Sequence, residues 1–198
     1  MARGLAVGAL KPIISGFDET DIAATDTGIL IAARGLAMTP QNIAEISPWR
    51  FIEPLSPDIA ATREGRTIDL DEVLNFCRNA LTGPEDVFLI EGIGGVMVPL
   101  DDRHTVLDWI VQLRLPTLLV VGSYLGSLSH SLTAVQALTG RGIDIKAVVV
   151  SESVSSPVPL IETADTLTRF LPGLDVLCAP RNNTEAIITL ADTIFPPT

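Results

Sequence analysis

Residues 87–95 read Val-Phe-Leu-Ile-Glu-Gly-Ile-Gly-Gly, an apolar run followed by one carboxylate and a glycine-rich segment. A short apolar run without polar alternation is typical of a strand covered on both faces, as in a parallel sheet. A helical pattern at 69–81, closed by Gly83-Pro84, precedes this strand, and another at His104–Leu113 follows it. A strand between two helices predicts an α/β protein with parallel strands.

The alternation of strands and helices continues toward the C-terminus. Leu118–Val121 and Ala147–Val150 are further short apolar runs, and a last strand is expected near Val176–Cys178. Apolar residues recur at helical spacing in three more segments, at 127–138, 158–171 and 184–194. We therefore predict one domain over residues 1–198, built as a parallel sheet with helices on both faces.

The N-terminal part of the chain is less regular. Leu5–Leu10 reads as a strand that ends at Lys11-Pro12, and a helix is expected over about Thr25–Arg34. The segment 35–67 contains four prolines and is interpreted as an excursion from the sheet. Within it we expect a short strand near residues 49–52 and a short helix near 58–63.

Composition excludes several classes of protein. The formal net charge is −11 and Lys and Arg do not cluster, which argues against non-specific nucleic-acid binding. Apolar residues make up 47% of the chain, yet no run approaches the roughly 20 residues of a membrane-spanning helix. There is no signal-peptide pattern, and two cysteines are too few for a disulfide framework. We expect a cytoplasmic protein with neither nucleic-acid nor membrane partners.

Ligands of parallel sheets bind beyond the carboxyl ends of the strands, so the residues after each strand are candidates. Glu91 can hold Mg²⁺, and the glycines after it let backbone N–H groups approach an anion; the alternative is a polar turn. Lys11 can hold a phosphate or a developing carboxylate charge, or else it is a surface lysine. Asp26, at a predicted helix start, is either a helix cap or a second carboxylate for the same metal.

Gly126-Ser127 opens the helix predicted at 127–138. The free N–H groups and the dipole of a helix N-terminus favour an anion there. His130, one turn into this helix, and His104, near Asp101, are interpreted as structural residues. The sequence has no Cys/His cluster with zinc-ligand spacing and no Gly-x-Ser-x-Gly motif.

Four groups of residues, in this order and spacing, resemble one family. They are Lys11-Pro12-Ile13-Ile14-Ser15-Gly16, Glu53-Pro54 with Arg63-Glu64-Gly65, Ile90-Glu91-Gly92-Ile93-Gly94-Gly95 running on to Val98-Pro99-Leu100, and Leu125-Gly126-Ser127-Leu128-Ser129-His130. The chain resembles the dethiobiotin synthetases, the ATP-dependent ligases of biotin biosynthesis. The agreement runs from residue 5 to about residue 180.

The resemblance implies a P-loop-type α/β fold, a homodimer, and the use of ATP and Mg²⁺. The implied reaction closes the ureido ring of 7,8-diaminononanoate with CO₂, through a carbamate and a carbamic-phosphoric anhydride. Lys11 would be catalytic, and Asp26 and Glu91 would bind Mg²⁺. The substrate would contact Ser15 and, across the dimer interface, Leu125, Gly126, Ser127 and Ser129. ATP would lie near Asp26, Glu91, Gly92, Ile93, Gly94, Ser151, Glu152, Pro180, Arg181 and Asn182.

The sequence departs from the family at three places. It contains no Gly-x-x-x-x-Gly-Lys-Ser/Thr phosphate loop, so we expect the family's first strand and P-loop helix to be missing. Ser129 stands where many members have Asn, and Ser151-Glu152 stands where an Asn-Asp pair is usual.

The leading hypothesis is an ATP-dependent cyclo-ligase, with very low activity expected of the chain as written because the phosphate cradle is lacking. One alternative is a non-catalytic remnant that folds, dimerises or binds only the diamine. A second alternative is a related cobyrinate-type ligase. Binding of the diamine without ATP would favour the remnant, and substrate profiling would separate the two ligases.

Overall fold

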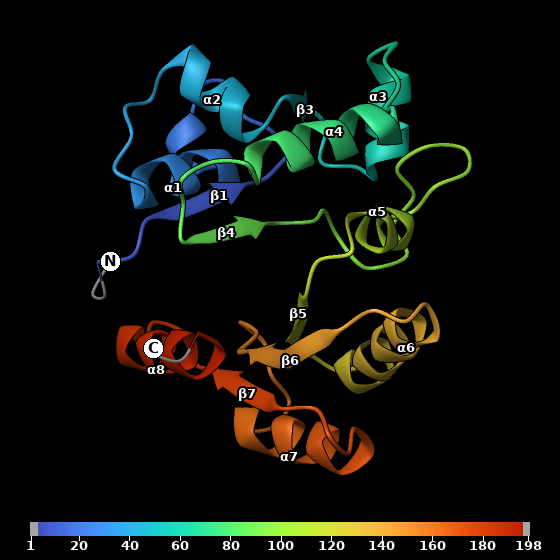
Figure 1. Ribbon diagram of the computed structural model, residues 1–198. Coiled ribbons are helices and arrows are strands. Elements are labelled where there is room, and N and C mark those ends of the chain that lie inside the picture. Colours follow the sequence, from blue (N-terminus) through green and yellow to red (C-terminus); the bar gives the residue numbers. More distant parts are fainter. Residues whose placement is uncertain (1–3, 196–198) are drawn as a thin grey trace. The chain divides into compact units, whose positions relative to one another are not determined.

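The computed structural model describes residues 4–195, which form two compact units that meet in the chain between Leu113 and Arg114 (Figure 1). The first unit contains β1 (Val7–Leu10), β2 (Ile13–Ser15), the 3-10 helix η1 (Ile22–Ala24), α1 (Asp26–Ala33), α2 (Pro40–Ile46), β3 (Trp49–Phe51), α3 (Pro57–Arg63), α4 (Leu70–Ala80), β4 (Val87–Ile90) and α5 (Val106–Leu113). The second contains β5 (Thr117–Gly122), α6 (Ser127–Gly140), β6 (Ile145–Ser151), α7 (Leu160–Phe170), β7 (Val176–Ala179) and α8 (Thr184–Ile194). The single domain expected from the sequence stays a prediction.

Every strand pair within these residues is parallel, as predicted. In the first unit β1 pairs with β4, with Val7 opposite Val87, and β2 pairs with β3. In the second unit the strand order is β5–β6–β7. The α/β class with parallel strands is therefore confirmed.

The main core of the first unit lies around α4, α5 and β3. Helix α4 begins where the sequence predicts, because the Asp69 carboxylate accepts hydrogen bonds from the N–H groups of Asp71 and Glu72 at 2.8 and 3.2 Å. Its apolar stripe, Val73, Leu74 and Cys77, is at most 1% exposed. Burial raises the pKa of the Cys77 thiol to about 11, so this cysteine is an inert core residue.

A second, smaller core lies where α1 and α2 pack beside β1 and β2 (Figure 1). Helix α2 was not predicted, although its start has a recognisable signal. Thr39 caps the helix through a 3.2 Å bond from the Asn42 N–H, and Pro40 occupies the first turn. Strand β2 was also missed, because three residues after a proline carry no periodicity.

Burial on both faces, expected for three strands, is found in only one of them. Strand β6 has a neighbour on each side, and its Val148 and Val149, which point to opposite faces, are 0% and 5% exposed. Within residues 4–195, β4 and β5 each pair along one edge only. Leu89 of β4 is 44% exposed and Val120 of β5 is 64% exposed, so the two-face expectation is wrong for these strands.

Several helix and strand boundaries in the structure differ by two residues from those predicted. Strand β1 begins at Val7 rather than Leu5, and α5 begins at Val106 rather than His104. The C-terminal α8 has the bounds predicted for it. No helix in the described part of the chain is long and apolar enough to cross a membrane.

Candidate active site

Lys11 lies directly after β1 and is only 6% exposed, so it is not the surface lysine that the sequence left open. Its ammonium group lies 2.6 Å from Glu91 Oε1, 2.8 Å from the Gly92 carbonyl oxygen and 3.3 Å from Asp26 Oδ2. Two of its three N–H donors make hydrogen bonds, to Glu91 and to the Gly92 carbonyl oxygen, and Asp26 adds an ion pair. A buried cation needs such partners, because an unpaired one pays a large desolvation penalty.

Asp26 reaches Lys11 because another residue caps its helix. The Thr25 hydroxyl accepts a hydrogen bond from the Gly28 N–H at 3.2 Å, and it donates to the Ile22 carbonyl oxygen at 2.7 Å. Asp26 is therefore the first residue of α1 and not its cap, and its carboxylate is 52% exposed. The first turn of α1 also sits tightly on η1, since a Cβ atom on Gly28 would lie 2.0 Å from the Ile22 carbonyl oxygen.

Glu91 is placed by the end of the β1–β4 ladder. Its N–H donates to the Leu10 carbonyl oxygen at 2.8 Å, which carries the parallel pairing one residue beyond β4. Its side chain is 53% exposed, so the Glu91 carboxylate pairs with Lys11 and also faces solvent. The following loop turns at Gly94, whose φ of +60° and close approach to Val98 both favour glycine.

These three side chains make one charged cluster from sequence positions up to 80 residues apart. It contains one ammonium and two carboxylates, so its formal charge is negative and a divalent cation is attracted to it. No group of three or more His, Cys, Asp or Glu residues suited to a metal occurs within residues 4–195. A metal here would rest on the two carboxylates and on oxygens from water or a ligand, a common arrangement for Mg²⁺.

Ser15 ends β2 and is half-buried, opposite Phe51 of β3. The chain then turns at Gly16, whose φ is +73° and whose N–H donates to the Glu53 carbonyl oxygen at 3.1 Å. The structure thus places Ser15 in the same unit as Lys11. Its contact with a substrate stays a prediction.

The other predicted substrate residues lie in the second unit, at the start of α6. Leu125 is 87% exposed, Gly126 has a φ of +97°, and Ser127 is buried. No side chain caps this helix among the described residues. The Tyr124 hydroxyl lies 2.9 Å from His130 Nδ1 in an exposed contact, and the structural role of His130 stays a prediction.

The remaining residues predicted to lie near ATP are found at the carboxyl ends of β6 and β7. The Glu152 N–H donates to the Ala179 carbonyl oxygen at 3.0 Å, and Glu152 Oε2 accepts from the Arg181 N–H at 2.8 Å. Asn182 turns the chain with a φ of +56°. Ser151 and Pro180 lie beside these contacts in the chain.

A reciprocal serine pair, which sequence reasoning missed, joins the ends of β5 and β6. The Ser123 N–H donates to Ser153 Oγ at 3.0 Å, and the Ser153 N–H donates to Ser123 Oγ at 2.9 Å. Ser123 is 1% exposed. Because serines are common in loops of every kind, no sequence signal could have identified this pair.

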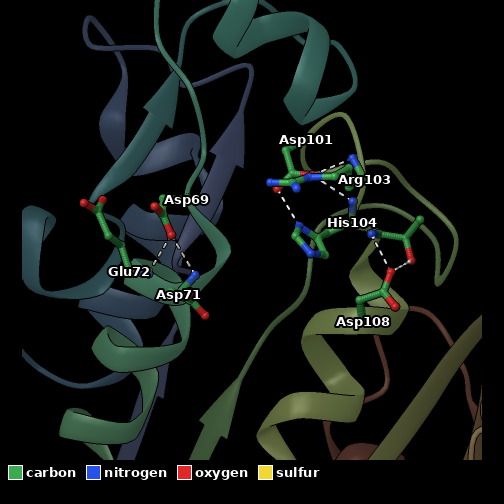
Figure 2. A network of polar contacts seen from close by, with 8 residues as sticks. Asp69, Asp71, Glu72, Asp101, Arg103, His104 and Asp108 are labelled. Atoms are coloured by element: carbon green, nitrogen blue, oxygen red, sulfur yellow. Dashed lines mark hydrogen bonds and ion pairs between the residues drawn. The ribbon is translucent and has the colours of Figure 1, made fainter.

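Another polar cluster follows the glycine-rich loop and is shown in Figure 2. Asp101 Oδ1 accepts from the N–H groups of Arg103 and His104 at 2.7 Å each, and Asp101 Oδ2 lies 2.8 Å from His104 Nδ1. Burial acts to raise the pKa of the Asp101 carboxyl, but these hydrogen bonds outweigh it and hold the pKa below its usual value. His104 thus orders the loop before α5, as the sequence suggested.

Two cavities have linings that do not include Lys11, Asp26 or Glu91. One, of about 510 Å³, runs between β7 and α8 and includes Pro180 and Asn183 in its lining. The other, of about 160 Å³, lies in the first unit between Phe17, Arg50 and Arg66. Apart from Pro180, neither lining contains a residue predicted for the site.

The comparisons with known proteins identify the class first. A family model described as an AAA domain matches residues 1–185. With the parallel α/β units and the lysine, carboxylates and glycines at the strand ends, this match defines a P-loop-NTPase-like α/β protein.

Three relatives then identify the family. ATP-dependent dethiobiotin synthetase BioD of Methylobacterium nodulans is 45% identical over 185 residues, covering 91% of this chain and 82% of the relative. The synthetase of the same name from Acidiphilium cryptum is 48% identical over 164 residues, 82% of this chain and 74% of the relative. That of Caulobacter sp. is 45% identical over 194 residues, 98% of this chain and 83% of the relative. The chain belongs to the dethiobiotin synthetase family, and the resemblance stated from its sequence is confirmed.

Proposed function

We propose that this protein is an ATP-dependent ligase of biotin biosynthesis, which makes dethiobiotin from 7,8-diaminononanoate, CO₂ and ATP. The family membership supports the reaction. The observation that carries the proposal to particular residues is the buried Lys11 ammonium held between Asp26 and Glu91.

The chemistry of the reaction explains why such a cluster is needed. An amine that takes up CO₂ becomes a carbamate anion, which must then attack the γ-phosphate of ATP. Two anions approach one another in this step, and a fixed positive charge between them lowers their repulsion. In the proposal, Lys11 supplies that charge. The attack releases ADP and leaves a carbamic-phosphoric mixed anhydride. The second amine then attacks the carbonyl carbon of this anhydride within the same molecule and expels inorganic phosphate, a step favoured by proximity.

The half-exposed carboxylates of Asp26 and Glu91 fit Mg²⁺, since hard cations prefer carboxylate oxygens and often keep only one or two protein ligands. When bound, Mg²⁺ supplies charge neutralisation for the phosphate oxygens of ATP. The backbone N–H groups of Gly92, Ile93 and Gly94 are proposed to lie near the same phosphates, because φ at Gly94 is positive and glycines let the backbone approach an anion closely.

The residues of the second unit receive the remaining proposed roles. The start of α6, at Leu125–Ser129, would bind the substrate carboxylate within a homodimer, through the free N–H groups of a helix N-terminus. Ser151, Glu152 and residues 180–182 would flank the base of ATP. Two free cysteines in the described residues fit a reducing compartment, and we place the protein in the cytoplasm, without nucleic-acid or membrane partners.

A product assay tests the proposal. The purified protein would be incubated with ATP, Mg²⁺, bicarbonate and diaminononanoate, and dethiobiotin would be measured by mass spectrometry. Mass spectrometry is chosen because detection of the product is more sensitive than detection of ADP release. We expect dethiobiotin with ATP and none without it.

Calorimetry with each substrate alone separates the outcomes. Binding of both ATP and the diamine is expected. Binding of the diamine without ATP, together with no dethiobiotin, would contradict the ligase and support a protein that only binds the substrate. ATP hydrolysis stimulated by a cobyrinate-type acid but not by the diamine would contradict the assignment of the substrate.

A further inference from the structure

Thr27 and Ser47 form a hydroxyl pair inside the first unit that no catalytic role explains. Both residues are fully buried, and Thr27 Oγ1 lies 2.7 Å from Ser47 Oγ. The surrounding contact between α1 and α2 is otherwise apolar, through Ile31, Ile43 and Ile46. Apolar contacts alone tolerate small slides of one helix on another, whereas a buried hydroxyl without a partner is costly.

Ser47 lies in the middle of a segment that holds the backbone of Lys11. The Lys11 N–H donates to the Ile46 carbonyl oxygen at 3.2 Å, and the Trp49 N–H donates to the Pro12 carbonyl oxygen at 3.1 Å. These bonds fix Lys11-Pro12 from both sides. The segment 46–49 therefore holds the backbone of Lys11 in place; it is called the frame segment below.

Through its hydrogen bond with Ser47, Thr27 connects this frame segment to the helix that carries Asp26. Successive residues of a helix are turned by about 100°, so Thr27 and Ile31 share the buried side of α1 while Asp26 points elsewhere. Fixing Thr27 fixes the rotation of the first turn of α1. That rotation decides whether Asp26 Oδ2 remains 3.3 Å from the Lys11 ammonium.

We propose that Thr27 and Ser47 are positioning residues, whose hydroxyl pair sets the distance between Lys11 and Asp26. The inference rests on the proposed function for its catalytic meaning, because that function is what brings ATP to these two side chains. The hydroxyl pair acts only through them and touches no reactant.

The chain offers an unusually direct test, since Lys11 and Lys146 are its only lysines. Amine labelling with acetic anhydride, read by mass spectrometry, compares buried Lys11 with Lys146, whose side chain is 54% exposed. The thiol of fully buried Cys77, labelled in parallel with iodoacetamide, reports general opening of the first unit. The variants are Thr27→Val, which removes the hydroxyl at nearly constant shape, and Thr27→Ser, which keeps it.

We expect Thr27→Val to raise Lys11 labelling about tenfold relative to Lys146, the size expected from one buried hydrogen bond. Thr27→Ser should stay near the unchanged protein, and Cys77 labelling should not change. Thr163→Val, a matched change at a buried threonine of α7, should leave Lys11 labelling unaltered. If Thr27→Val does not fold, Ser47→Ala removes the same pair from the other side.

Two outcomes would overturn the inference. Equal acceleration at Lys11 and Cys77 would mean that the hydroxyl pair only stabilises the unit as a whole. No acceleration of labelling at Lys11 would mean that Asp26 is held in place without the hydroxyl pair.

In the product assay, Thr27→Val should raise KM for ATP and lower kcat, with Thr27→Ser restoring both. A protein that makes no dethiobiotin would refute the proposed function, while the labelling result would still decide the positioning role.

Discussion

The carboxyl ends of the strands carry different chemistry in the two units. After β1 and β4, a buried ammonium is shared by two carboxylates and a carbonyl oxygen. After β5, β6 and β7, the contacts are between hydroxyls, backbone N–H groups and one exposed carboxylate. The first arrangement places charge where a reaction can use it. In the second arrangement the polar groups hydrogen-bond one another and hold the strand ends together. It is therefore suited to shaping a surface.

The largest effect that this comparison predicts is at Lys11. Lys11→Met should lower dethiobiotin formation by at least about 100-fold, because it removes the fixed charge that faces the reacting anions. Folding should change little, since Asp26 and Glu91 are about half-exposed and remain solvated. The product assay and thermal unfolding measure the two effects. Lys146→Met, at an exposed lysine paired with Asp144, is the control, and equal losses in both variants would contradict a specific role for the Lys11 charge.

The next largest effect belongs to the second unit and concerns stability. Ser123→Ala should destabilise that unit by about 1 kcal/mol, because it leaves the partly buried Ser153 N–H without its acceptor. Both tryptophans lie in the first unit and the single tyrosine in the second, so hydrogen exchange of β5 and β6 amides is the appropriate measurement. Tryptophan fluorescence should report no change. A loss of stability in the first unit alone would contradict the assignment.

At acid pH, protonation of Asp101 is expected to lower the stability of the first unit. The folded pKa of this carboxyl is lowered, so its contribution to stability is present above its unfolded pKa, about 3.9, and is lost as pH falls through the folded pKa. The free energy of unfolding, followed by tryptophan fluorescence, falls as the pH is lowered. In Asp101→Asn this loss at acid pH should be smaller by on the order of 1 kcal/mol. Asp102→Asn, at the exposed neighbouring carboxyl, is the matched control. An unchanged acid limb in Asp101→Asn would show that the hydrogen bonds of Asp101 drawn in Figure 2 contribute nothing to stability.

The smallest effect is expected at Arg181. Arg181→Ala keeps the N–H that donates to Glu152 Oε2 and loses only the exposed 3.2 Å bond from Nε to the Glu152 carbonyl oxygen. The free energy of unfolding should therefore change by no more than about 0.5 kcal/mol, as for most exposed contacts. Glu152→Ala, which removes the acceptor itself, should cost more. A larger loss at Arg181 would mean that the guanidinium, and not the backbone, orders this edge.

Much of this layout could be predicted from local sequence. The capped and periodic helix α4, the central strand β6 and the C-terminal α8 were all expected, because periodicity and capping are properties of neighbouring residues. Strand β2 and helix α2 were not, since one is too short to show a period and the other is embedded in a proline-rich segment. The exposure of Leu89 and Val120 was not predictable either, because what covers the face of a strand depends on distant segments.

The sequence by itself determined the parallel α/β class, the family and the three charged candidates Lys11, Asp26 and Glu91. Only the tertiary structure decided that Lys11 is buried, that Thr25 and not Asp26 caps α1, and that Glu91 shares its carboxylate with a lysine 80 residues away. The physical reason is that residue type and spacing establish what a side chain can do. Whether it is desolvated, paired and aimed at a partner depends on contacts made by segments far apart in the chain.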